Sequence, residues 1–253
     1  MAWALALPGA LAVGFSMGLF GSGGSILTVP ILVYMLEWDE KVAIASSLAI
    51  VGLVAAITSL RNLSAKQIDW HAVLWFGIPG VVGTYLGAYL SKFFPGWVQM
   101  ATFAAVMGLA SFFMLRPAPK RDPDAPDHSL VWIMIEGLAV GALTGFVGVG
   151  GGFLIVPALI LLAGLNMARA TASSLVIIAL KSAAGFIGYQ QILSETGQVL
   201  DWVVIACFVA FGLLGSWYGT TLARTANQAR LQQGFGGFLV IMAGWILWRS
   251  VLA

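Results

Sequence analysis

Two dense runs of glycine are the features of this sequence best suited to bind a ligand. The first is Gly21, Ser22, Gly23, Gly24 and Ser25, and the second is Gly148, Val149, Gly150, Gly151 and Gly152. Each run interrupts a long apolar stretch. It is therefore expected to expose the start of a following half-helix, with free N–H donors and partial positive charge. Two such ends predict an anion site made of backbone. The alternative is that the glycines only permit close helix packing.

Two ionisable residues lie inside apolar stretches. Lys181 is about thirteen residues into the segment 168–189, where a charge is costly and usually faces a cavity or a partner. It favours an anionic ligand, and two alternatives stay open: the side chain reaches the interface, or it pairs with a structural carboxylate. Glu136 is either a proton-coupling carboxylate or an interfacial side chain near the lipid headgroups.

Hydroxyl and amide side chains offer further candidates. The pairs Ser46-Ser47 and Ser173-Ser174 recur at matching positions, and they either bind the ligand, through Ser47 and Ser174, or bond across helices. Tyr189-Gln190-Gln191 ends a segment and is either part of a gate or a solvated helix end. His71 and His128 lie far apart, so we assign no metal site. With no nucleophile–base–acid set visible, neither an enzyme nor a cofactor is expected.

The elements that position these residues are apolar helices. Of 253 residues, 60% are hydrophobic and 9% charged, whereas a soluble domain has about 25% charged residues. Lipid must therefore be the main solvent, which excludes a cytosolic enzyme. A dispersed net charge of +2 excludes nucleic-acid binding. A helix that spans a bilayer needs about 20 apolar residues. The segments of that kind are 42–60, 71–91, 98–115, 168–189, 202–223 and 231–248.

The chain is an internal duplication around a polar, proline-rich linker at 116–129, with repeats at 1–115 and 130–253. A shift of 127 residues places Gly21, Pro30, Ser46 and Ser47 on Gly148, Pro157, Ser173 and Ser174. A shift of 132 residues places Asp69-Trp70 on Asp201-Trp202, and it places Gly80, Gly83 and Gly87 on Gly212, Gly215 and Gly219. Trp70 and Trp202 are expected to anchor their helices at the membrane interface.

The stretches 3–36 and 130–163 are too long for one crossing, and each is broken by glycine. If each folds back as a hairpin, the two repeats are inverted; if each crosses once, they are parallel. Cytoplasmic loops are rich in Lys and Arg. The hairpin arrangement puts eight such residues on one side and three on the other. The eight are Arg61, Lys66, Arg116, Lys120, Arg121, Arg169, Arg224 and Arg230, and the three are Lys41, Lys92 and Arg249. If each broken stretch crosses once, the two sides hold six and five Lys and Arg residues. We therefore favour hairpins, with a cytoplasmic linker and both termini periplasmic.

The motif GLFGSGGSILTVP at 18–30 and its copy GFVGVGGGFLIVP at 145–157 are each followed by an Ala-Ser-Ser-Leu segment. This doubled pattern resembles the TauE/SafE sulfite exporter family over nearly the whole chain. The resemblance implies a bacterial inner-membrane secondary transporter of small sulfur-containing anions, such as sulfite, sulfoacetate or other organosulfonates. The first copy has Ser22 and Ser25 where the second has Val149 and Gly152, so the two half-sites are unequal.

The predicted fold is an all-α polytopic membrane protein with two homologous inverted repeats. Each repeat is a glycine-broken re-entrant helical hairpin followed by three transmembrane helices. The predicted function is alternating-access transport of an anion, with proton coupling. A passive anion channel and a non-transporting membrane partner subunit are the alternatives. The expected partners are the small anion and the lipid bilayer, and the sequence leaves open whether the protein forms homo-oligomers.

Overall fold

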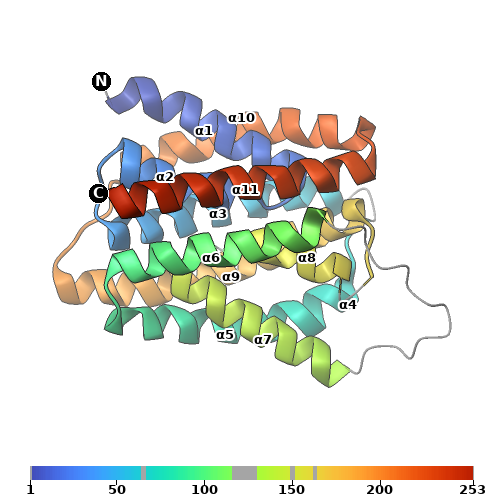
Figure 1. Cartoon of the computed structure of the whole chain (residues 1–253), viewed down its shortest axis with the longest axis horizontal. Helices are drawn as coiled ribbons and strands as arrows, with labels where there is room; N and C mark the ends of the chain where they lie inside the picture. The colour runs from blue at the N-terminus through green and yellow to red at the C-terminus, as the bar shows by residue number, and fades with distance from the viewer. Residues whose placement is uncertain (1, 64–66, 116–129, 149–151, 162–163, 253) are drawn as a thin grey trace.

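The described part of the chain is entirely helical in the computed structural model (Figure 1). The structure describes residues 2–63, 67–115, 130–148, 152–161 and 164–252. The linker at 116–129 and Val149, Gly150 and Gly151 lie outside the described residues. The helices form one bundle in which most elements run along the same long axis.

The same order of elements occurs twice. The first repeat contains α1 (Ala2–Phe20), α2 (Gly23–Pro30), η1 (Ile31–Met35), α3 (Glu40–Leu63), α4 (Trp70–Ala72), η2 (Val73–Gly77), α5 (Ile78–Leu90), η3 (Ser91–Phe93) and α6 (Gly96–Leu115). The second contains α7 (Leu130–Val147), α8 (Gly152–Leu161), α9 (Met167–Thr196), α10 (Trp202–Thr225) and α11 (Gln228–Leu252). All six predicted spans fall on these helices.

Seven helical segments of the described chain are long and apolar enough to cross a membrane. Six are the predicted spans, and the seventh is α7 (Leu130–Val147), which the sequence placed in the first arm of the second hairpin. The length of α7 does not decide whether it crosses the membrane or forms the first arm of a hairpin. It is long enough to cross, and it also ends at the predicted glycine break.

Both breaks are sharp turns built on a glycine. Gly21 has φ of 75° and Gly148 has φ of 72°, a left-handed conformation that side chains with a Cβ rarely adopt. The Gly21 N–H donates to Met17 O and the Gly148 N–H donates to Thr144 O, each at 2.8 Å. These are matching C-terminal caps of α1 and α7. The predicted breaks are therefore confirmed at equivalent residues.

After the first break, the chain runs back along α1. A Cβ on Gly23 would lie 2.8 Å from Ser16 Cβ, and a Cβ on Gly24 would lie 2.8 Å from Val13 O. Further along, a Cβ on Gly9 would lie 3.3 Å from the Ile31 side chain. Residues further along the returning arm therefore contact residues nearer the start of α1. The stretch from α1 to η1 is therefore an antiparallel hairpin.

Pro30 ends α2, and the chain continues as the π-helix η1. Proline has no N–H and its ring crowds the carbonyl four residues earlier, so one hydrogen bond of the α-helical ladder is lost at Pro30. The wider turn of η1 extends the returning arm to Met35. The returning arm of the first hairpin thus ends at Met35, next to Leu36, the last residue of the predicted stretch 3–36.

Glycines let two helix pairs pack with backbones in contact, and the two pairs are copies. Helix α5 packs along α7, where Cβ atoms on Gly83 and Gly87 would lie 2.2 Å from Leu138 O and 2.0 Å from Ala142 O. Helix α10 packs along α1, where Cβ atoms on Gly215 and Gly219 would each lie 2.2 Å from a carbonyl oxygen, of Leu11 and Phe15 respectively. Each contact pairs one repeat with the other. The packing explanation therefore holds for these glycines.

The corresponding helices α3 and α9 pack against each other at the centre of the bundle. A Cβ on Gly52 would lie 3.0 Å from Ser182 Cβ, and a Cβ on Gly185 would lie 3.3 Å from the Leu48 side chain. The numbers run in opposite senses, so these two copies are antiparallel. Figure 1 shows the same relation for the hairpins, since α1 begins at the left end of the bundle and α7 begins at the right end. Both chain termini lie at the left end, which we call the termini end; the opposite end is the linker end.

The helices that begin at Trp70 and Trp202 have matching N-caps. The Asp69 carboxylate accepts a hydrogen bond from the Ala72 N–H at 2.9 Å, and the Asp201 carboxylate accepts from the Val203 and Val204 N–H groups. Both tryptophans are more than half exposed. This geometry agrees with the interfacial role that the sequence predicts for them.

The glycine contacts predict that two alanine substitutions change the free energy of unfolding by very different amounts. Gly87→Ala should lower the free energy of unfolding by about 1–3 kcal/mol, because α5 and α7 must separate to admit the methyl group. Gly108→Ala is the matched control. No atom lies within 4 Å of a Cβ at that helical position, and alanine favours a helix by about 1 kcal/mol. Thermal unfolding of the purified variants in detergent measures both effects; equal melting temperatures would contradict the packing.

Candidate functional site

The first hairpin tip presents backbone donors that no side chain caps. Ser22 is the N-cap residue of α2, with φ of −151°, and its hydroxyl makes no capping hydrogen bond. Ser22 is fully buried, and its Oγ has no hydrogen-bond partner. The Ser25 hydroxyl donates to Ser22 O at 2.9 Å. The N–H groups of the first turn and the Ser22 hydroxyl are therefore the donors that this tip offers.

The two hairpin tips meet. A Cβ on Gly152, the first residue of α8, would lie 2.8 Å from Ser22 Cβ and 2.6 Å from Ile178 Cδ1. The convergence predicted from the two glycine runs is thus present between Ser22 and Gly152. Gly152 has no side chain where the first repeat has Ser25, so the two half-sites differ as the sequence indicated.

Helix α9 holds the carbonyl groups of the first tip. The Ser174 Oγ lies 3.2 Å from Gly21 O and 2.9 Å from Thr171 O. The Ser173 Oγ accepts a hydrogen bond from the Asp69 N–H at 2.8 Å. For this pair, the structure favours the cross-helix alternative over direct ligand binding.

The corresponding pair on α3 is different. Ser46 and Ser47 are fully buried, and neither Oγ has a hydrogen-bond partner. A buried hydroxyl without a partner is costly, and such groups in a native structure usually await a water or a ligand. The duplicated serines therefore divide into one satisfied pair, Ser173-Ser174, and one unsatisfied pair, Ser46-Ser47.

Lys181 is the strongest candidate for binding a negative charge. The residue is fully buried, and its Nζ has no hydrogen-bond partner. Its Nζ lies 5.1 Å from the centroid of the Phe76 ring. Neither alternative from the sequence is realised, because the ammonium group reaches no interface and pairs with no carboxylate. It lies one helical turn from Ile178, whose side chain contacts the start of α8.

Gly80 provides the space for the lysine side chain. A Cβ on Gly80 would lie 2.2 Å from Lys181 Cε, so any larger residue would displace the lysine. In the mirrored contact, a Cβ on Gly212 would lie 3.2 Å from Val54 Cγ2. Val54 and Gly212 are the matching positions, so the charge is present on one side of the pseudosymmetric site and absent on the other.

Glu136 lies on α7 and is half-buried. It immediately precedes Gly137, where a Cβ would lie 2.3 Å from Phe76 O. Phe76 is also the residue whose ring faces Lys181. Both candidate ions therefore flank the same short segment, η2.

Sequence analysis missed a buried polar chain at the second hairpin tip. Lys41 Nζ donates to Gln99 Oε1 at 2.6 Å and to Ser91 O at 2.7 Å. Gln99 Nε2 donates to Phe146 O and to the Tyr189 hydroxyl, the latter at 2.6 Å, and that hydroxyl donates to Phe146 O at 3.0 Å. Gln99 and Tyr189 are fully buried. Two signals of this chain are present in the sequence: Gln99 near the start of an apolar helix, and Tyr189, named above as part of a gate or a solvated helix end.

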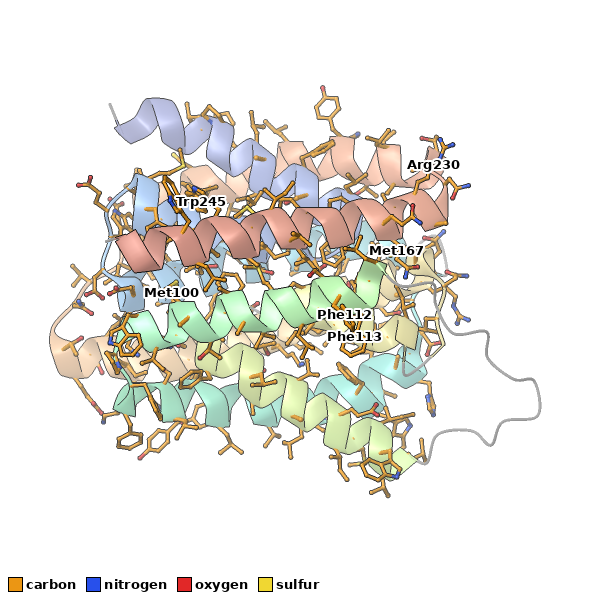
Figure 2. The ribbon with its side chains drawn as sticks, viewed as in Figure 1. Met100, Phe112, Phe113, Met167, Arg230 and Trp245 are labelled. Carbon is orange, nitrogen blue, oxygen red and sulfur yellow. The ribbon has the colours of Figure 1, made fainter. Side chains whose placement is uncertain are left out.

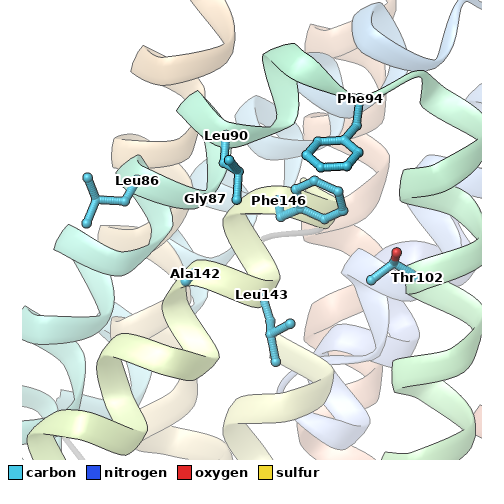
Figure 3. Close-up of a pocket in the computed structure, with 8 residues that line it drawn as sticks. All are labelled: Leu86, Gly87, Leu90, Phe94, Thr102, Ala142, Leu143 and Phe146. Atoms are coloured by element: carbon cyan, nitrogen blue, oxygen red, sulfur yellow. The ribbon is translucent and has the colours of Figure 1, made fainter.

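The described part of the structure contains two further cavities. The first, about 380 Å³, lies between α5, α6 and α7 (Figure 3). Its one hydroxyl side chain, Thr102, donates to Val98 O within its own helix, so the cavity offers an anion no side-chain donor. The second, about 460 Å³, lies where α9 turns into α10, and it is lined by Gln190, Ser194, Gln198 and neighbouring residues.

The class of protein that these features define is a multi-pass membrane transporter, and similar proteins carry that description. A probable membrane transporter protein of Xylella fastidiosa is 30% identical over 94% of this chain and 92% of its own length. Proteins with the same description in Methanocaldococcus jannaschii and Bacillus subtilis are 29% and 27% identical over 73% and 83% of each chain. The model of the sulfite exporter TauE/SafE family matches residues 6–246, and the chain belongs to that family. No solved structure matches it.

The fully buried Lys181 and the half-buried Lys41 predict opposite effects of the same substitution. Lys181→Met should raise the free energy of unfolding by about 1–3 kcal/mol, because it removes a buried ammonium group that has no hydrogen-bond partner and only the Phe76 ring beside it. Lys41→Met should lower it by about 1–3 kcal/mol, because Ser91 O and Gln99 Oε1 lose their donor. Melting temperatures measured without substrate compare the two variants directly. A destabilised Lys181→Met protein would show that its ammonium group has a stabilising partner.

Proposed function

We propose that this protein is a secondary active transporter of small sulfur-containing anions, such as sulfite, sulfoacetate or other organosulfonates. The observation that carries the proposal is a set of fully buried donors without partners: the Ser22 hydroxyl at the first tip and the Lys181 ammonium group one turn from the second. An ammonium group together with N–H and O–H donors favours an oxyanion, whose oxygens accept several hydrogen bonds. Family membership supports the same class of substrate.

The substrate site of this proposal is formed by both hairpin tips. It includes Gly21, Ser22, Gly23 and Gly24 with Gly148 and Gly152, the undescribed Val149, Gly150 and Gly151, and the side chain of Lys181. Backbone N–H groups at a helix start need no reorganisation to bind an anion. Lys181 supplies the charge that compensates the cost of placing that anion in a hydrocarbon layer. Ser47 lies on α3 with a free hydroxyl and adds a donor along the route.

The proposed mechanism is alternating access by two inverted repeats. Two observations support the inversion: the copies α3 and α9 pack antiparallel, and α1 and α7 begin at opposite ends of the bundle (Figure 1). In this arrangement, α1 with α2 and η1 forms one re-entrant hairpin and α7 with α8 forms the other. Rocking of one repeat against the other would open the tips first to one side and then to the other.

The proposal also assigns the orientation of the protein in the membrane and the residue that couples transport to protons. We assign the linker end to the cytoplasm of the bacterial inner membrane, because cytoplasmic loops are rich in Lys and Arg. Arg230 lies at that end in Figure 2, as does Met167, which precedes Arg169 by two residues. Both termini are then periplasmic. Proton coupling is assigned to Glu136, which is half-buried beside the segment that faces Lys181. Whether the protein works as a homo-oligomer does not affect these assignments.

Transport of labelled sulfite and organosulfonates into proteoliposomes tests this function, with and without a pH gradient. We expect saturable uptake that a pH gradient accelerates. Lys181→Met should reduce uptake at least about tenfold, the loss that corresponds to roughly 1.4 kcal/mol of anion binding. The control is Gly108→Ala, a change remote from the tips. Flux that does not saturate and carries net current would instead identify a passive anion channel, and no flux would favour a partner subunit.

Single cysteines test the inverted topology. In a Cys207→Ser background, Glu37→Cys and Val199→Cys should react with a membrane-impermeant thiol reagent from the same face, and Ala229→Cys should react from the other face. The hairpin arrangement places Glu37 and Val199 together, whereas single crossings of the two broken stretches would separate them. Labelling of Glu37→Cys and Val199→Cys from opposite faces would overturn the inverted repeats.

A further inference from the structure

The hydrogen bonds of the Lys41–Gln99–Tyr189 chain have a defined direction. An ammonium group only donates, so Lys41 must face the amide oxygen of Gln99. This orientation leaves the Gln99 NH2 group to donate to Phe146 O and to the Tyr189 hydroxyl. The Tyr189 hydroxyl then gives its own proton to Phe146 O. The charge of Lys41 therefore holds Gln99 in the one orientation that binds the second hairpin.

The chain joins the two repeats next to a hairpin turn. Lys41 and Gln99 belong to the first repeat, whereas Phe146 and Tyr189 belong to the second. Phe146 lies two residues before the left-handed Gly148, and a Cβ on Gly148 would lie 3.1 Å from the Tyr189 hydroxyl. The carbonyl that the chain binds is one that α7 leaves free at its C-terminus.

The chain lies between the unsatisfied serines and the termini end of the bundle. In Figure 2, Met100, the neighbour of Gln99, is at the left, and Met167, at the start of α9, is at the right. Along α3, Ser47 is six residues further into the bundle than Lys41, which corresponds to about 9 Å of helix. Ser46 and Ser47, with their unpartnered hydroxyls, therefore lie beneath the chain.

Each end of the bundle has a polar contact that the other end lacks. The residues that match Lys41, Ser91 and Gln99 in the second repeat are Ala168, Ala223 and Leu231, which cannot form the same chain. At the linker end, Arg169 Nη2 instead lies 3.0 Å from the Asp69 carboxylate, in a partly exposed ion pair between the repeats. The matching residue of Arg169 is the uncharged Val42.

We propose that the Lys41–Gln99–Tyr189 chain is the gate on the termini side of the transport route. When it is formed, the second hairpin is bound to the first repeat, and the way from Ser46 and Ser47 to that end is closed. Opening requires Gln99 and Tyr189 to release Phe146 O. Lys41 is a positioning residue, since it acts through the orientation of Gln99. The inference rests on the proposed transport function, because a gate requires a solute route.

Side-specific labelling of a cysteine beneath the chain tests the gate. The reporter is Ser47→Cys in a Cys207→Ser background, reconstituted in one orientation and treated with a membrane-impermeant thiol reagent without substrate. Tyr189→Phe retains the ring and removes the hydroxyl, and Gln99→Leu removes the amide. Each should raise the labelling rate from the termini side about tenfold, as expected for the loss of one or two net hydrogen bonds. The rate from the linker side should stay unchanged.

The matched control is Arg169→Gln, which removes the ion pair at the other end and should leave the rate from the termini side unchanged. If a core variant fails to fold, Lys41→Met tests the same gate from its half-buried end. Unchanged labelling, or an equal rise from both sides, would overturn the proposal. Because no anion is present, a wrong substrate assignment would not alter this result, and failure of the gate would leave the transport assay unaffected.

Discussion

A helix that stops within a hydrocarbon layer leaves backbone groups that lipid cannot bind, and this constraint governs the whole molecule. Under the proposed re-entrant topology, both hairpins stop in this way, at Gly21 and Gly148. Their carbonyl ends receive donors from neighbouring helices, namely Ser174 on α9 for the first tip and Gln99 with Tyr189 for the second. At the first tip, the N–H groups that begin the returning arm receive no side-chain cap. The protein satisfies the negative ends of its broken helices and leaves a positive end available.

The same constraint explains why the two repeats have diverged. Close backbone packing is retained in both copies, because Gly83 and Gly87 with α7 repeat the contacts of Gly215 and Gly219 with α1. The caps at Asp69 and Asp201 are also retained, but the polar side chains of the central helices are not. Helix α9 carries Lys181, Tyr189 and a satisfied serine pair, whereas α3 carries Val54 at the position of the lysine and an unsatisfied serine pair. The scaffold is thus nearly symmetric and its chemistry is not.

Much of the fold could be predicted from the sequence, because its signals are local. Apolar runs of fixed length marked the spans, and Gly21 and Gly148 marked turns that need a left-handed backbone. Lys181 was identifiable because a charge among apolar residues is costly. The partners of long polar side chains were not accessible, since Gln99 meets Lys41, Phe146 and Tyr189 across 58, 47 and 90 residues. Nor could the sequence separate Ser46-Ser47 from Ser173-Ser174, which are identical in type and differ only in what surrounds them.

The contact between Gly80 and Lys181 bears on how the molecule acquired its charge. Because Gly212 faces Val54 in the mirrored position, both copies have a glycine opposite this site on the central helix. A lysine could therefore enter one copy of the duplicated gene by changes at a single codon, without a compensating change elsewhere. Loss of the glycine would remove the lysine side chain from its place even in a protein whose lysine codon is intact. If Lys181 binds the anion as proposed, position 80 is in that sense part of the binding chemistry, although it contributes no functional group.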